Sequence, residues 1–141
     1  MATKKEIEEM LRKSGYSEKA IEYYTDKTNL GKIENPDVES TYMGICGDVM
    51  TFTLKVEKNR IKDIKFQATC CAGGLSAGSA ATKLVQGKTV DEARKLTEED
   101  IARHLEGCPK QKLHCIVLAL KSLKKALDEY SEKEKSSKNK K

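Results

Sequence analysis

The feature that most constrains the fold is a nine-residue stretch, VMTFTLKVE at 49–57, in which apolar and polar side chains alternate strictly. This period of two is typical of a strand with one buried face. A turn at Lys58-Asn59 leads into a second stretch of the same kind at 60–69, with Ile64, Phe66 and Ala68 facing inward. The two stretches predict an antiparallel hairpin. Residues 38–44 are a weaker candidate for a third strand.

After the hairpin, apolar residues recur at helical spacing, so the expected structure changes from strands to helices. The stretch 70–87 carries Ala77, Ala81, Leu84 and Val85 at helical spacing and predicts a helix that ends at Gly87, because glycine is common just past a helix end. Two short helices are expected to start at Thr89 and Thr97, each with an acidic residue three positions later that can complete a capping box. The longest helix is expected to begin between Pro109 and Lys112 and to end near Tyr130. Its apolar stripe consists of Leu113, Ile116, Val117, Leu120, Leu123 and Leu127.

Two further helices are expected before the hairpin. The first covers 3–13, and the second follows the N-cap residue Ser17 to about residue 27, with Ile21 and Tyr24 on one face. A small antiparallel sheet followed by helices on one side is an α+β fold. We therefore expect one domain at 1–130, in which 1–15 forms an extra N-terminal helix, and a disordered basic tail at 131–141.

The composition excludes some classes of function. The 141 residues carry a net charge of +5, and +3 of it lies in the last eleven residues, which hold five Lys and two Glu. With two Phe and no Trp, the chain lacks the stacking aromatics of a nucleic-acid surface. No apolar run is long enough to span a membrane, and the charged start lacks the apolar region of a signal peptide. We expect a cytoplasmic protein without nucleic-acid or membrane partners.

The five cysteines raise the question of metal or redox chemistry, because disulfides are rare in the cytoplasm. Cys46 and Asp48 lie two residues apart just before a strand, and Cys71 stands where a strand gives way to a helix. His114 and Cys115 lie in the first turns of the long helix, whose dipole favours a thiolate. Such ligands suit zinc or an iron–sulfur cluster. Scattered core thiols and a Cys–His nucleophile remain as alternatives.

Five stretches of the sequence resemble the IscU/NifU-type scaffold for iron–sulfur cluster assembly, within its IscU branch. They are YSEKAIEYY at 16–24, CGDVM at 46–50, IKFQATCC at 64–71, LVQGKTVDEA at 84–93 and KLHC at 112–115. The resemblance implies a protein that accepts persulfide sulfur from a cysteine desulfurase, binds iron, builds a [2Fe–2S] cluster and passes it to apo-proteins. It implies an assembly scaffold, not a turnover enzyme, with a ferredoxin-type electron donor as another partner.

Carried over by position, the resemblance implies that Cys46, Cys71 and Cys115 ligate the cluster, with Asp48 or His114 as the fourth ligand. Lys112 matches the family's lysine. Cys115 is the expected persulfide acceptor, because a nearby cation and a helix N-terminus lower a thiol pKa. Asp48 is expected to keep the cluster labile. Zinc is an alternative metal for the apo form, and a homodimer could share a cluster with an exposed edge.

Some residues depart from the family pattern or carry no signal. Residues 108–112 read CPKQK where the family has Leu-Pro-Pro-Val-Lys, which weighs against an Hsp70-type chaperone as a partner. Cys70 is expected to pack inward, Cys108 to be a bystander and His104 to lie solvated on the surface. The alternative function is a zinc-binding sulfur-transfer partner of a desulfurase, as in the SufU branch. That branch typically has an insertion before the last cysteine and lacks the adjacent histidine, and this chain has neither feature.

Overall fold

The computed structural model describes residues 3–44, 47–69, 72–106 and 113–139. The elements are, in chain order, α1 (Lys4–Lys13), α2 (Glu18–Asp26), β1 (Val38–Met43), β2 (Val49–Glu57), β3 (Arg60–Thr69), α3 (Ala72–Val85), α4 (Val90–Arg94), α5 (Glu98–His104) and α6 (Leu113–Asn139). The three strands form one antiparallel sheet in the order β1-β2-β3. The expected α+β class is confirmed, and so are the hairpin and the weaker third strand.

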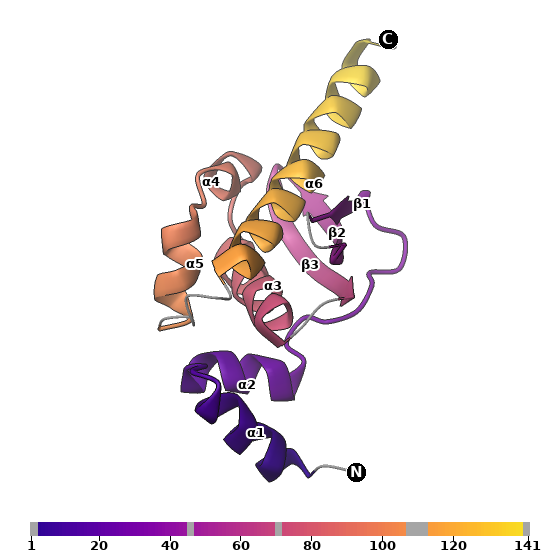
Figure 1. Ribbon diagram of the computed structural model, residues 1–141. Helices are drawn as coiled ribbons and strands as arrows, with labels where there is room; N and C mark the ends of the chain where they lie inside the picture. The colour runs from indigo at the N-terminus through magenta and orange to yellow at the C-terminus, as the bar shows by residue number, and fades with distance from the viewer. Residues whose placement is uncertain (1–2, 45–46, 70–71, 107–112, 140–141) are drawn as a thin grey trace.

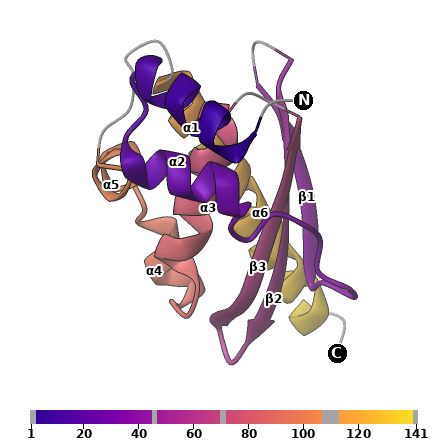
Figure 2. The same ribbon diagram turned by 90° about the horizontal axis from the view of Figure 1, so that it is seen from below.

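Helices α3 and α6 pack on one face of the sheet (Figure 1). The fully buried side chains of that face come from the alternating positions of β2 and β3: Met50, Phe52, Leu54, Ile64 and Phe66. The approach of α3 is close, because a Cβ on Gly78 would lie 2.5 Å from the Phe66 ring. Figure 2 shows α4 and α5 on the side of α3 away from the sheet, while α2 lies across α3.

Local sequence signals account for most element boundaries. Lys58 and Asn59 both have positive φ, at 52° and 65°, as the tight turn between β2 and β3 requires. Both capping boxes are present, at Thr89 with Glu92 and at Thr97 with Asp100. The capping hydrogen bond from the Thr89 backbone holds the pKa of Glu92 below its usual value.

Several expectations about burial are wrong by one position or one face. In α2 the buried tyrosine is Tyr23, while Tyr24 is half-buried. Thr53, expected to face solvent, is 1% exposed because the segment before β1 covers it, and the Ile33 N–H donates to its hydroxyl at 3.1 Å. Leu113, expected in the apolar stripe of the long helix, is 48% exposed.

The long helix was expected to end near Tyr130. Instead it continues to Asn139. No glycine or proline follows Tyr130 to stop it, and lysine and glutamate are good helix formers. Contacts with the body also continue past Tyr130. Arg94 donates to Ser131 Oγ at 2.5 Å, and Lys133 Nζ donates to the Asp37 carbonyl at 2.8 Å.

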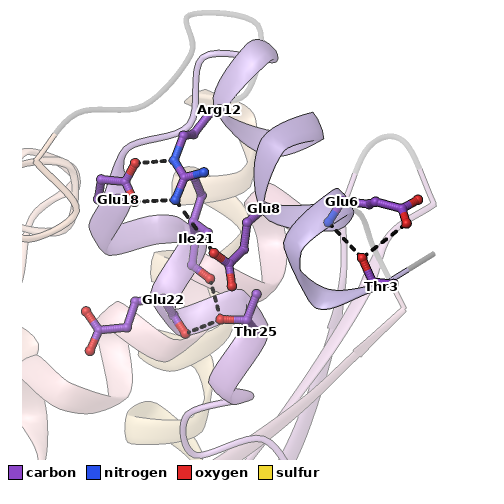
Figure 3. Close-up of polar contacts among 8 residues, drawn as sticks. All are labelled: Thr3, Glu6, Glu8, Arg12, Glu18, Ile21, Glu22 and Thr25. Carbon is purple, nitrogen blue, oxygen red and sulfur yellow. Dashed lines mark hydrogen bonds and ion pairs between the residues drawn. The ribbon is translucent and has the colours of Figure 1, made fainter.

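The N-terminal helix α1 contacts α2. It has no buried residue, and Arg12 makes ion pairs with Glu18 of α2 and with Glu8 (Figure 3). In the same view the Thr25 hydroxyl donates to the carbonyls of Ile21 and Glu22 inside α2. None of the described helices combines the length and the apolar character needed to cross a membrane.

Candidate functional site

The segments that carry the first two cysteine motifs attach to the same end of the sheet. Val49, the first residue of β2, pairs with Met43 of β1 on one side and with Thr69 of β3 on the other. The Cys46 segment joins β1 to β2, and the Cys70-Cys71 segment follows β3. The sheet register therefore brings the described flanks of both motifs side by side.

The loop between β1 and β2 is held by its own backbone. The Gly44 N–H donates to the Asp48 carbonyl at 2.8 Å, and the Gly47 N–H donates to the Gly44 carbonyl at 3.0 Å. Gly47 has φ +85°, a conformation that favours glycine. Gly44 lies so close to α6 that an added Cβ would be 3.1 Å from the Leu118 side chain. The absence of a side chain at Gly44 thus lets the loop approach the helix that carries the third motif.

A hollow of about 150 Å³ lies between this loop and α6. Its lining residues are Tyr42, Gly44, Asp48, His114, Val117, Leu118 and Lys121. Asp48 and His114, predicted from sequence as alternative fourth ligands, are therefore brought together on the wall of one hollow. A carboxylate and an imidazole in that arrangement can each offer a lone pair to a metal that enters it.

The adjacent residues His114 and Cys115 lie in different environments. The His114 side chain is exposed, whereas Cys115 is fully buried, at 0% exposure. Its Sγ nevertheless lies 3.6 Å from His114 Nε2. Neighbouring residues on a helix point about 100° apart, which explains the contrast. In this conformation the thiol is within reach of the imidazole but closed to solvent.

The remaining predicted ligands, Cys46 and Cys71, lie outside the described residues, as do Lys112, Cys70 and Cys108. Among the residues that are described, no three His, Cys, Asp or Glu side chains come together closely enough to hold a metal ion. The structure places Asp48 and His114 on one hollow and the Cys115 thiol next to His114, and the predicted ligand set stays an expectation.

His104 is not the solvated surface residue that was expected. It is half-buried between α5 and α2, where its Nε2 lies 2.6 Å from the Tyr23 hydroxyl and the two rings stack with centroids 5.8 Å apart. Desolvation and nearby Lys19 lower the pKa of His104. The residue joins two helices and does not line the hollow.

The sequence did not predict that the hollow is also lined by Tyr42, Val117, Leu118 and Lys121. Val117 and Lys121 lie three and seven positions after His114, so helical periodicity could have placed them on the same face. Tyr42 gave no such signal, because its place depends on how α6 packs against β1.

Comparison with known proteins identifies the family to which the chain belongs. The family model described as "NifU-like N terminal domain" matches residues 15–137. The chain belongs to the NifU-like N-terminal domain family. The match begins after α1, so that helix precedes the family region.

Members of this family with curated names are similar over most of the chain. The iron–sulfur cluster assembly scaffold protein IscU 1 of Archaeoglobus fulgidus is 44% identical over 119 residues, covering 84% of this chain and 78% of that protein. The scaffold protein IscU of Escherichia coli is 38% identical over 123 residues, covering 84% and 95%.

Solved structures of NifU-like proteins share the fold. A putative iron–sulfur cluster assembly scaffold protein for the SUF system from Fervidobacterium islandicum has a TM-score of 0.67 at 25% identity, covering 79% of this chain and 96% of that one. A NifU-like N-terminal structure from Brucella abortus has a TM-score of 0.68 at 20% identity, covering 87% and 99%. At 20% identity, the likeness to the Brucella abortus structure supports the fold alone.

Proposed function

We propose that this chain is a scaffold on which iron–sulfur clusters are built and from which they are handed to other proteins. The observation that carries the proposal is the hollow, where Asp48 and His114 face one space beside Cys115. Relatives at 38–44% identity are named as scaffolds for this assembly, which supports the same function.

The proposed ligands of the assembled [2Fe–2S] cluster are Cys46, Cys71 and Cys115, with Asp48 or His114 as the fourth. Four thiolates hold such a cluster firmly. An oxygen or nitrogen ligand in the fourth position is a poorer match to cluster iron and eases exchange. This mixed set suits a protein that must release its cargo.

The proposed sulfur step begins at Cys115. Its thiolate attacks the outer sulfur of a donor persulfide, the donor S–S bond breaks, and the donor leaves as a thiolate while Cys115 becomes the persulfide. No net oxidation occurs in this transfer. His114 Nε2, 3.6 Å from Sγ, can take up the thiol proton. Because Cys115 is fully buried, the first turn of α6 must open before a donor can reach it.

The proposed partners follow from these steps. Sulfur comes from a cysteine desulfurase, electrons from a ferredoxin-type donor, and the cluster goes to apo iron–sulfur proteins. The cluster is cargo, so the chain acts as a scaffold and not as a turnover enzyme, although one Drosophila relative is named an assembly enzyme. The motif at 108–112 weighs against an Hsp70-type chaperone, as expected from the sequence.

The test is anaerobic reconstitution of single-cysteine variants with iron and sulfide, read by visible absorption and by iron and sulfide content. Cys46→Ser, Cys71→Ser and Cys115→Ser should lose the cluster. Cys70→Ala and Cys108→Ala are the matched controls and should keep it. Loss of the cluster in Cys70→Ala together with its retention in Cys71→Ser would move the ligand by one position.

A second candidate function is zinc-dependent sulfur transfer without cluster assembly, favoured by the likeness to the SUF-system protein of Fervidobacterium islandicum. The same thiolates and Asp48 would suit zinc. Metal analysis of protein purified without oxygen separates the two functions. Iron with sulfide and a visible spectrum supports the scaffold, and a colourless protein with one zinc that accepts no cluster supports the alternative.

A further inference from the structure

The hollow beside α6 carries two opposite charges on its wall. Of the described residues that line it, Lys121 is the one lysine and Asp48 the one carboxylate. In the described part of the chain, neither of the two belongs to an ion pair. The wall also includes the apolar side chains of Val117 and Leu118, the second of which is buried. A cation and an anion thus face one small space without neutralising each other by direct contact.

The helical repeat explains why Lys121 reaches the hollow. It lies seven residues after His114, which is close to two turns, so the two side chains leave α6 on the same face. Their Cα atoms are about 10 Å apart along the helix axis. Side chains of a helix lean toward its N-terminus, so the Lys121 side chain leans toward His114 and not away from it.

The next lysine along this face is already engaged. Lys125 Nζ donates to the Thr41 carbonyl at 2.6 Å, which holds that ammonium group against β1. Lys121 is exposed, and no hydrogen bond or ion pair of its side chain is seen among the described residues. The ammonium group of Lys121 is therefore available to whatever enters the hollow.

We propose that Lys121 is a positioning residue that draws the anionic reactants of the proposed chemistry into the hollow. The inference rests on the proposed function, in which the sulfur donor leaves as a thiolate and the cluster acceptors present thiolates. An ammonium group beside apolar walls attracts such anions more strongly than one surrounded by water. Asp48 on the same wall repels them, and Lys121 offsets that repulsion.

The test uses two alkylating reagents of nearly the same size that differ in charge, anionic iodoacetate and neutral iodoacetamide. In both reactions the Cys115 thiolate forms a bond to the reagent carbon and iodide leaves. The two rates are measured on the full-length apo protein by mass spectrometry of the peptide that contains Cys115, whose Sγ lies 3.6 Å from His114 Nε2. The ratio of the iodoacetate rate to the iodoacetamide rate cancels the pKa of the thiol and the opening of α6. It reports how the surroundings treat a negative charge.

Lys121→Gln should lower this ratio by about two- to fourfold at low salt, because it removes a positive charge from the wall of the hollow. Lys121→Arg keeps the charge and should keep the ratio. Asp48→Asn removes the repelling charge and should raise the ratio. Lys124→Gln is the matched control, because it removes the same charge from the same helix at a position that does not line the hollow. It should stay close to the wild type.

Equal ratios in the wild type and in Lys121→Gln overturn the proposal, and so does an equal decrease in Lys124→Gln. A decrease in Asp48→Asn as well would show that the ratio follows the shape of the loop and not its charge, which also overturns it. If Lys121→Gln does not fold, as judged by circular dichroism, Lys121→Met takes its place, since methionine is a good helix former of similar length.

The same variants, loaded with cluster, separate this inference from the proposed function. Lys121→Gln should transfer its cluster to an apo-ferredoxin more slowly than the wild type, and Lys121→Arg should not. Normal assembly and transfer in Lys121→Gln, together with an unchanged alkylation ratio, contradict the role of Lys121 alone. A wild type that assembles no cluster, while the ratio changes as expected, contradicts the proposed function and leaves Lys121 as an anion-attracting group of the hollow.

Discussion

Cys115 lies inside the core while His114 beside it lies in solvent, although the proposed chemistry uses both. A buried thiol reacts with external reagents only when the structure opens locally. In the proposed function, the rate of sulfur acceptance by Cys115 would therefore depend on how often the first turn of α6 opens.

We predict that Cys115 in the folded apo protein is alkylated by iodoacetamide at least about tenfold more slowly than in the chain unfolded in urea. The readout is mass spectrometry of the peptide that contains Cys115 at a series of quench times. The urea-unfolded chain is the internal control for the intrinsic reactivity of the thiol. Equal rates in the two states would show that the thiol is open to solvent and that no opening step is needed.

Asp48 acts, in the proposed function, by keeping the cluster exchangeable. We predict that Asp48→Ala transfers its cluster to an apo-ferredoxin more slowly than the wild type, because the variant loses a hard oxygen from a set of soft thiolates. His114 lines the same hollow and can take the fourth position. Transfer is followed anaerobically by visible circular dichroism.

The control for this measurement is Glu39→Ala. Glu39 is an exposed carboxylate on β1 that pairs with Lys32 and does not line the hollow. It should transfer its cluster as the wild type does. If Asp48→Ala transfers as fast as the wild type or faster, Asp48 serves only the shape of the loop.

Helix α5 leads toward the third cysteine motif, and its attachment to α2 therefore matters for where α6 begins. The attachment consists of the Ser17 hydroxyl bound to the Leu105 carbonyl and the contact between Tyr23 and His104. Burial raises the pKa of Tyr23, so its hydroxyl stays protonated and can donate. Burial and Lys19 lower the pKa of His104, which favours the neutral ring, the form that can accept from Tyr23.

This contact predicts a pH dependence of stability. The folded pKa of His104 lies below the unfolded value near 6.5, so the unfolded chain binds more protons in the window just below 6.5. The contribution of His104 is full above that pH and decreases as pH falls through the window. Glu106 opposes the shift and Lys83 adds to it.

The measurement is the midpoint of urea unfolding of the wild type and of His104→Gln at about pH 7.5 and about pH 5.5. The wild type should lose more stability than the variant over this interval. Tyr23→Phe tests the hydrogen bond while keeping the ring. An equal loss in the wild type and in His104→Gln would show that His104 does not titrate in the window.

Elements whose signals are local were predicted well from the sequence. The hairpin follows from alternation, its turn from Lys58-Asn59, and the two capping boxes from side chains three residues apart. Features that depend on packing between distant segments were predicted less well. Whether Tyr23 or Tyr24 is buried, and whether Thr53 is covered, depends on neighbours that no local pattern names.

In the candidate site, too, local signals were predicted from the sequence and features set by long-range packing were not. Spacing and resemblance selected Asp48, His114 and Cys115. In the structure Asp48 and His114 line one hollow, and Cys115 Sγ lies 3.6 Å from His114 Nε2. The sequence signals could not show that Cys115 is buried or that Tyr42 and Lys121 also line the hollow, because both facts follow from the packing of α6 on the sheet.

At the scale of the whole molecule, α6 extends past the compact body (Figure 1). We predict that truncation after Glu134 leaves the free energy of unfolding unchanged. Truncation after Tyr130 should lower it by about 1 kcal/mol, because it removes the contacts of Ser131 with Arg94 and of Lys133 with Asp37.

Urea unfolding of the two truncated proteins beside the full chain checks this prediction. Each truncated protein should still accept a cluster in reconstitution, since the hollow lies at the other end of α6. A large loss of stability on removal of 135–141 would show that these residues contribute to the fold beyond the contacts described.

The turn at Lys58-Asn59 lies at the far end of the hairpin from the candidate site. Eight residue steps of β2, from Val49 to Glu57, separate them, which at about 3.3 Å per residue is about 26 Å. Lys58 and Asn59 are exposed. A chain tethered to a bead or an electrode through a cysteine-free linker inserted at this turn would present the hollow of Asp48 and His114 to the solution, so that delivery and removal of cargo could be followed on an immobilised molecule.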